Sequence, residues 1–330
     1  MSEILVEVTR GGMVESIHRG DLVAVDTRGS DLFHLGNAHK KTYWRSAAKP
    51  FQVLPLVEAG GMERFGLTPE ELALMTSSHS GEERHIAAAK SILTKIDQSA
   101  EVLECGIAPP MSKRAANEIL KQGRTFTTLT NPCCGKHTAM IALAIVKGLD
   151  ISGYAQPIHP VQHEMLRTIA DISGLMPKDI TIGIDGCGVP VFGMPLFNMA
   201  IAYAHLSRPN LCPEPRKTAL GTIASAMVKH PFMVAGSKRL DTDLMEATQG
   251  RILAKLGAEG IYCVSVMEEG IGIALKIEDG NSRAIDPVII EVLNRMGFLS
   301  PDELAALRSR QEGKIRNNRK ETVGIIRHTF

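Results

Sequence analysis

The sequence has few aromatic residues, with one Trp, four Tyr and nine Phe among its 330 positions. Proteins that bind single-stranded nucleic acid stack bases on aromatic side chains set among basic ones, and this chain offers little for such a surface. An excess of one charge is also missing, because 37 basic and 36 acidic side chains leave a formal net charge of +1. We therefore expect no nucleic-acid partner and no attraction to an anionic membrane.

Long apolar runs are absent as well. The longest clean run, 139–146, is far shorter than the roughly 20 residues that a helix needs to span a bilayer. The opening sequence, MSEILVEVTRGG, lacks the basic stretch and the apolar core of a secretory signal. With 44% hydrophobic and 22% charged residues, the composition is that of an ordinary globular protein, and we expect a folded, soluble, cytoplasmic one.

The chain contains six cysteines, and without an export signal we expect them to be reduced thiols. Metal ligation or catalysis is then favoured over a disulfide framework. Cys105, Cys212 and Cys263 lie in apolar or loop contexts, and we expect them to act as small buried hydrophobic residues.

The hydrophobic pattern changes its period along the chain. Alternation predicts strands in the first 43 residues, with turns at 11–12, 19–21 and 28–30, and again at 260–278 and 321–330. Spacing of three to four predicts helices elsewhere, at 46–59, 68–76, 84–97, 113–121, 138–147, 160–173, 194–206, 215–229, 284–296 and 301–309.

This order predicts a mixed α/β (α+β) fold. The N- and C-terminal segments, 1–45 and 256–330, form one antiparallel sheet on which helices pack. The remaining residues, 46–255, form a mostly helical part beside it, and the two parts make one continuous catalytic unit. A cleft between them is the default place for a functional site.

The first candidate site is Ser46-Ala47-Ala48-Lys49, where strand pattern gives way to helix pattern. Residues three apart share a helix face, so the lysine amine can reach the serine hydroxyl. A neutral, desolvated lysine can take the proton of a serine, which is otherwise a poor nucleophile. Short motifs of this kind also occur by chance on solvated helices. The position after the N-terminal strands favours the functional reading, because serine acyl enzymes of the penicillin-binding type carry S-x-x-K there.

Two further segments could belong to the same cleft. Lys255-Leu256-Gly257 precedes the C-terminal strand pair, where the same architecture places its K-T-G motif. Leu256 replaces the hydroxyl residue of that motif, which argues against a β-lactam substrate. The hydroxyl-rich segment 76–82, which contains Ser78, is more typical of a helix cap when it is judged alone.

Asn131-Pro132-Cys133-Cys134-Gly135-Lys136-His137 and the later Cys187 could hold a thiophilic metal such as zinc. A phosphate loop is excluded, because Thr130 stands where its first glycine is needed. From the residues alone we favour Cys133, His137 and Cys187 as ligands, since a lysine must lose a proton before it binds metal. His159 and His163 are spaced for a metal pair, but we interpret them as a helix start.

The chain resembles the Rhizobium etli-type L-asparaginases, also called class 3 or the asparaginase II family, in six motifs that occur in order. These motifs are S-A-A-K at 46–49, S-S-H-S-G-E at 77–82, C-C-G-K-H at 133–137, I-D-G-C-G-V-P at 184–190, V-A-G-S-K-R-L-D-T at 234–242 and K-L-G-A-E-G at 255–260. The resemblance implies a homodimeric amidohydrolase with a serine β-lactamase/glutaminase-like fold that hydrolyses L-asparagine to L-aspartate and ammonia.

The resemblance also implies roles for individual residues. Two serine–lysine tandems are expected, Ser46 with Lys49 and Ser78 with Lys255, and the nucleophile is expected at Ser46. A zinc site is implied at Cys133, Lys136 and Cys187, with Asp185 holding a water beside it. The resemblance thus implies Lys136 as a ligand in place of His137. Arg45 and His137 are expected to line the pocket, with Arg45 as the partner of the substrate α-carboxylate.

One position departs from the resemblance, because Cys134 stands where a serine is expected between the first cysteine and the glycine. A second thiol there could tighten the metal, move it or simply pack. Two other functions stay open, a glutaminase or related serine amidohydrolase and a zinc- or amino-acid-binding sensor without turnover. Glutamine is longer than asparagine by one methylene group, and a binding pocket can distinguish two substrates that differ by one methylene by only about 1–3 kcal/mol.

Overall fold

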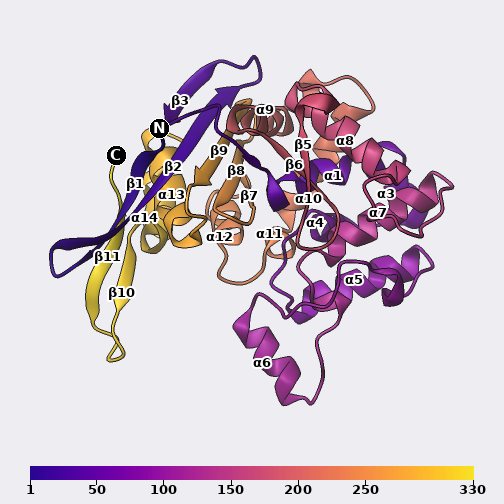
Figure 1. Cartoon of the computed structure of the whole chain (residues 1–330), viewed down its shortest axis with the longest axis horizontal. Helices are drawn as coiled ribbons and strands as arrows, with labels where there is room; N and C mark the ends of the chain where they lie inside the picture. The colour runs from indigo at the N-terminus through magenta and orange to yellow at the C-terminus, as the bar shows by residue number, and fades with distance from the viewer.

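The two ends of the chain meet in one antiparallel sheet. The computed structural model describes residues 1–330, and the sheet has the strand order β10-β11-β1-β2-β9-β8-β7, with β3 paired to β2 (Figure 1). The strands are β1 (Glu3–Arg10), β2 (Met13–Asp26), β3 (Asp31–Leu35), β7 (Ile252–Leu256), β8 (Ile261–Val266), β9 (Ile271–Ile277), β10 (Gly313–Arg316) and β11 (Thr322–His328).

The centre of this sheet is covered on both faces. Every residue of β8 is buried, as expected for an apolar strand between two layers. Alternate residues of β2 belong to different cores, with Val23 and Val25 on one face and Leu22 and Ala24 on the other. The first face packs against α9 (Leu196–Ser207) and the second against α13 (Ile285–Arg295).

The helical part lies beside the sheet (Figure 1). A small sheet of order β4-β6-β5 connects to it and contains β4 (Lys41–Tyr43), β5 (Thr181–Ile184) and β6 (Pro190–Pro195). The other helices are α1 (Lys49–Gln52), α2 (Leu54–Glu58), α3 (Gly61–Phe65), α4 (Pro69–Met75), α5 (Glu83–Lys95), α6 (Lys113–Lys121), α7 (Cys134–Val146), α8 (Pro160–Ser173), α10 (Arg216–Lys229), α11 (Pro231–Val234), α12 (Leu240–Ala247) and α14 (Pro301–Gln311). None of them has the length and apolar composition that a membrane crossing requires.

The predicted mixed α/β architecture, with a sheet shared by both chain ends, is confirmed. The turn predicted at 19–21 is wrong, because β2 runs straight through it as one strand of 14 residues. Gly20 serves close packing there, since a Cβ atom would lie 2.5 Å from the Lys276 carbonyl oxygen. The sequence pattern also missed β7, β10 and two strands of the small sheet, β5 and β6, which are only four to six residues long. β7 extends the main sheet to include Lys255.

Candidate active site

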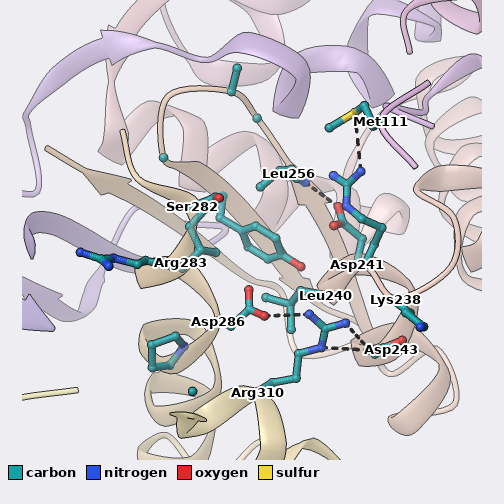
Figure 2. A pocket seen from close by; sticks show the side chains of 18 of the residues that line it. Met111, Lys238, Leu240, Asp241, Asp243, Leu256, Ser282, Arg283, Asp286 and Arg310 are labelled. Carbon is teal, nitrogen blue, oxygen red and sulfur yellow. Dashed lines mark hydrogen bonds and ion pairs between the residues drawn. The ribbon is translucent and has the colours of Figure 1, made fainter. Parts of the chain in front are cut away.

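Two cavities share a wall formed by Met111 and Leu256–Ala258. The outer cavity has a volume of about 920 Å³, and its lining includes several charged side chains, among them Asp241, Asp286 and Arg310 (Figure 2). The inner cavity has a volume of about 300 Å³. Six of the residues singled out in the sequence line the inner cavity: Arg45, Ser46, Ser78, Cys133, Asp185 and Cys187. Segments that are far apart in the sequence thus converge on one small space.

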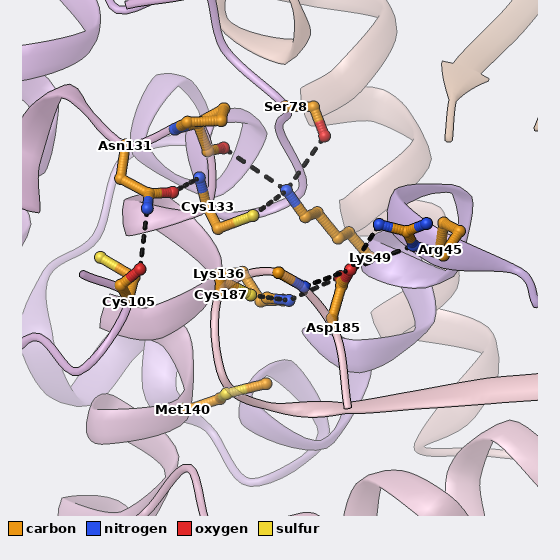
Figure 3. A network of polar contacts seen from close by, with 12 residues as sticks. Arg45, Lys49, Ser78, Cys105, Asn131, Cys133, Lys136, Met140, Asp185 and Cys187 are labelled. Atoms are coloured by element: carbon orange, nitrogen blue, oxygen red, sulfur yellow. Dashed lines mark hydrogen bonds and ion pairs between the residues drawn. The ribbon is translucent and has the colours of Figure 1, made fainter. Parts of the chain in front are cut away.

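The Lys49 amine lies at the centre of a polar network (Figure 3). Its Nζ donates to the Ser77 carbonyl at 2.5 Å and to Ser78 Oγ at 3.0 Å. Longer contacts of 3.4 Å join it to the Pro132 carbonyl and to Cys133 Sγ. The residue is 1% exposed, so a charged amine here is held by these acceptors rather than by water.

Ser46 stands at a sharp turn of the chain. It belongs to a 3₁₀ helix, Arg45–Ala48, between β4 and α1, which confirms that the motif begins where the strand ends. Arg45 has a φ of 52°, in the left-handed region that residues with a side chain rarely adopt. Such strained backbone is often found at functional sites. The turn puts Ser46 on the cavity wall, while Lys49 reaches Ser78 and has no hydrogen bond to Ser46.

Ser78 follows α4 in a buried loop. The helix-cap interpretation holds for the two ends of this segment, where Thr76 is the C-cap of α4 and Glu82 the N-cap of α5, but Ser78 lies between them and caps neither helix. The Ser78 N–H donates to the Val234 carbonyl at 3.0 Å, which fixes the loop against the end of α11. Ser78 is 7% exposed and its hydroxyl faces Lys49 (Figure 3).

Lys255, on β7, is completely buried. Its Nζ donates to the neighbouring Leu256 carbonyl at 2.8 Å, and no hydrogen bond joins it to Ser78. Burial lowers the pKa of Lys255 to about 7, and the nearby charge of Lys49 acts in the same direction. A lysine with this pKa can both give and take a proton near neutral pH.

Three candidate metal ligands lie together beneath the cavity. Lys136 Nζ donates to Cys187 Sγ at 3.0 Å, and a thiol hydrogen bond to Cys187 holds the pKa of Cys133 well below its usual value. Burial disfavours a charged Lys136, but the sulfur atoms and Asp185 outweigh it and raise the pKa of this amine. Asp185 lies 3.8 Å from Lys136 Nζ and accepts from the Arg45 guanidinium at 2.9 Å.

These donors suit a thiophilic metal in kind, since Cys187 is hydrogen-bonded to both the Cys133 sulfur and the Lys136 amine. The amine must lose its proton before it can bind a metal ion. No group of three or more His, Cys, Asp or Glu side chains has a metal-binding arrangement.

His137 and Cys134 have hydrogen-bond partners outside this group. His137 Nδ1 is 2.6 Å from the Tyr154 hydroxyl, and its buried Nε2 has no partner. Cys134 Sγ is 3.1 Å from His79 Nε2, and burial raises its pKa, so it packs as a neutral thiol. The interpretation of His159 as a helix start is confirmed, because it accepts the Val161 N–H at the beginning of α8.

The comparison with protein families gives one decisive result. The family described as L-asparaginase II matches residues 6–328. The chain belongs to this family. The L-asparaginase II family indicates an amidohydrolase, so the chain is an enzyme that hydrolyses amides. No curated protein matches the sequence.

Solved structures resemble this L-asparaginase II family member only distantly. A protein described as a beta-lactamase from Bacteroides dorei is 13% identical, with a TM-score of 0.45 over 83% of this chain and 93% of that one. A beta-lactamase from Mycobacterium bovis is 12% identical, with a TM-score of 0.45 over 85% and 95%. Mglu in its native form is 12% identical, with a TM-score of 0.40 over 87% and 62%.

Two residues that shape the site of this L-asparaginase II family member, Asn131 and Tyr154, had no role predicted from the sequence. Asn131 accepts the Cys133 N–H at 2.9 Å and donates to the Cys105 carbonyl at 2.8 Å, which fixes the turn before α7. Tyr154 orients His137 and also accepts the Glu104 N–H. Asn131 begins the quoted segment 131–137, which is a usable signal, whereas nothing in the sequence around Tyr154 distinguishes it from a core residue.

Proposed function

We propose that the chain hydrolyses the side-chain amide of L-asparagine to L-aspartate and ammonia through a serine ester intermediate. One observation carries this proposal: a buried lysine amine lies 3.0 Å from a serine hydroxyl at a small cavity that a second serine also lines. A serine beside a desolvated lysine is a typical nucleophile–base pair. The family supplies the amide as the bond that is broken.

In the proposed first step, neutral Lys49 takes the proton of Ser46, and Ser46 Oγ attacks the side-chain carbonyl carbon of asparagine. The C–N bond breaks, and the departing nitrogen takes a proton from the lysine network and leaves as ammonia. In the second step, water hydrolyses the aspartyl ester and the serine recovers its proton. Lys255 and Ser78 belong to this network as proton relay and positioning group.

Ser78 is a second candidate for the nucleophile, because Lys49 contacts it in this structure and does not contact Ser46. For Ser46 to be activated, the Lys49 amine must turn from Ser78 toward Ser46 when substrate enters. For Ser78 to be activated, no such movement is needed, since the proton crosses the existing 3.0 Å contact.

We further propose that Arg45 and Asp185 bind the α-carboxylate and α-amino ends of the substrate. Both side chains line the inner cavity, and they form an ion pair with each other. A substrate amino acid carries the same two charges, so it can insert between them with its carboxylate on the guanidinium and its ammonium on the carboxylate. The inner cavity is small enough to favour a free amino acid over a larger amide.

We propose zinc as the metal, held by Cys133, Lys136 and Cys187. When bound, it would supply positive charge that stabilises both thiolates and an uncharged Lys136 amine. Asp185 would then lie beside the metal as well as beside Arg45, so the metal would help to fix the groups that bind the α-carboxylate and α-amino ends. A homodimer of the Rhizobium etli type completes the proposal.

The experiment that tests the function is ammonia release by the purified protein with L-asparagine and L-glutamine side by side. We expect many turnovers on asparagine and few on glutamine. Activity that favours glutamine would refute asparagine as the substrate but would agree with the proposed serine–lysine hydrolysis of an amide. No turnover on either amide, in protein that contains zinc, would favour a sensor that binds without catalysis.

The nucleophile is decided by Ser46→Ala and Ser78→Ala, measured with hydroxylamine trapping of the ester intermediate. We expect Ser46→Ala to abolish both turnover and the trapped ester. Ser78→Ala should slow turnover while the ester still forms. The reverse pattern would assign the nucleophile to Ser78.

A further inference from the structure

The free edge of the main sheet is covered where it meets the active site. β7 is the last strand of the sheet, so the backbone groups on its outer side have no strand to pair with. The Leu256 N–H donates instead to Asp241 Oδ1 at 2.6 Å, and Figure 2 shows the Asp241 carboxylate directed at Leu256. Asp241 lies in the first turn of α12, whose N-terminal end favours a negative charge.

The other polar group of Leu256 is held from the catalytic side. Its carbonyl accepts from Lys255 Nζ at 2.8 Å. Leu256 is therefore bonded by a carboxylate at its N–H and by an amine at its carbonyl. It also forms part of the wall between the two cavities, so these two bonds fix the wall of the inner cavity.

Both charged side chains at this residue are buried, with Lys255 0% and Asp241 1% exposed. No salt bridge within 4.0 Å joins Asp241 to a cation. A buried carboxylate with one hydrogen bond and no countercharge is costly, and the same is true of a buried ammonium. Across Leu256, each of the two charges compensates the other.

The electrostatic effect of Asp241 on Lys255 opposes the effect of burial. Burial is the largest effect on the pKa of Lys255, which lies at about 7 even though the Asp241 charge raises it. The positive charges of Arg239 and Lys49 favour the neutral form of the Lys255 amine, whereas the negative charge of Asp241 favours its protonated form. The titratable and charged groups that surround the pair are Lys49, Cys133, Tyr203, Arg239, Tyr262, Cys263 and Asp286.

We propose that Asp241 is a positioning residue for Lys255: it holds the backbone of Leu256, to which the lysine amine is bonded, and it places a negative charge on the other side of Leu256 from this buried amine. The catalytic meaning of this assignment rests on the proposed serine–lysine chemistry, in which a protonated Lys255 returns a proton to the leaving ammonia. The placement of the two charges does not depend on that chemistry.

The test uses two isosteric substitutions on the same helix. Asp241→Asn keeps an oxygen for the Leu256 N–H and removes the charge. Asp243→Asn is the matched control, because its carboxylate binds Arg310 and makes no contact with Lys255. The Lys255 signal is followed by NMR in full-length protein labelled with ¹³C-lysine, and it is assigned by its loss in Lys255→Met. The pH dependence of kcat/KM for asparagine is measured on the same samples.

We expect Asp241→Asn to move the titration midpoint of Lys255 to lower pH, while Asp243→Asn leaves it in place. At a given pH the ratio of charged to neutral amine should fall by about tenfold, equivalent to about 1.4 kcal/mol of lost interaction. The limb of the kcat/KM profile that belongs to Lys255 should move in the same direction.

An unchanged midpoint in Asp241→Asn would overturn the proposal, and so would an equal shift in both variants. If Asp241→Asn does not fold, Asp241→Ser removes the charge with a smaller, neutral acceptor and is judged by the same criterion. Failure of the proposed function is seen separately, as absent ammonia release in all variants and wild type while the NMR midpoint still moves.

Discussion

Gly135 is the position where the fold and the candidate active site depend most directly on one missing side chain. It lies in the first turn of α7, between Cys133 and Lys136. A Cβ atom there would lie 2.8 Å from the carbonyl carbon of Leu74 and even closer to its oxygen, against 3.4–4 Å for an ordinary contact. The obstacle is backbone of α4, which cannot rotate away as a side chain could.

Gly135→Ala sets helix propensity against packing. Propensity alone favours alanine by about 1 kcal/mol, whereas overpacking a buried contact costs about 1–3 kcal/mol and sometimes more. Because the overlap is with backbone, we expect packing to win and the free energy of unfolding to fall by about 2 kcal/mol. Gly221→Ala in α10 is the control, since nothing lies within 4 Å of its Cβ position, and it should stabilise the protein by up to about 1 kcal/mol.

Urea unfolding followed by circular dichroism measures both variants. Gly135→Ala should also lose most ammonia release, because moving α7 away from α4 displaces Cys133 and Lys136 from Lys49. A Gly135→Ala protein as stable as Gly221→Ala would refute the reasoning, since it would mean that α4 and α7 separate at no cost.

Three further predictions concern the thiols, the histidines and the metal. Cys134→Ser should retain activity and metal content within about twofold, because Cys134 faces His79 and not the proposed ligands; loss of metal measured by atomic absorption would contradict this. Burial holds the pKa values of His79 and His137 well below their usual range, so both stay neutral in the folded protein and take up protons on unfolding below about pH 6.5. Stability should therefore fall with decreasing pH by up to about 1.4 kcal/mol per pH unit for each histidine, and His79→Gln should flatten the slope in urea titrations from pH 7 to 5. Chelation of the proposed zinc should raise KM or lower kcat for asparagine. Identical kinetic constants in metal-free protein would show that the metal has no role in the substrate pocket.

Much of the secondary structure follows from the sequence pattern because the elements concerned are long and strongly periodic. The helix predicted at 160–173 is α8 with the same bounds, and the pair predicted within 260–278 is β8 and β9. Short elements were missed because four to six residues give too little pattern to separate a strand from a loop. β7 is one of these, although it carries Lys255.

For the candidate site, the sequence motifs identified the residues but not which of them contact one another. Ser46 and Lys49 were expected to pair because they lie three residues apart, yet Lys49 contacts Ser78, 29 residues away in sequence. Helix spacing places two side chains on one face, but the 3₁₀ turn and the strained φ of Arg45 change where each one points. Asp241 was present in a quoted motif, and its contact with Leu256 depends on how α12 packs along β7.

By itself, the sequence determined the fold class, the order of most helices and strands and the set of residues with chemical potential, because these depend on local periodicity and on residue type. Only the tertiary structure decided which of these residues meet. Hydrogen bonds, burial and the resulting pKa of Lys255 arise from atoms brought together across long stretches of chain, and one-dimensional spacing carries no measure of such distances.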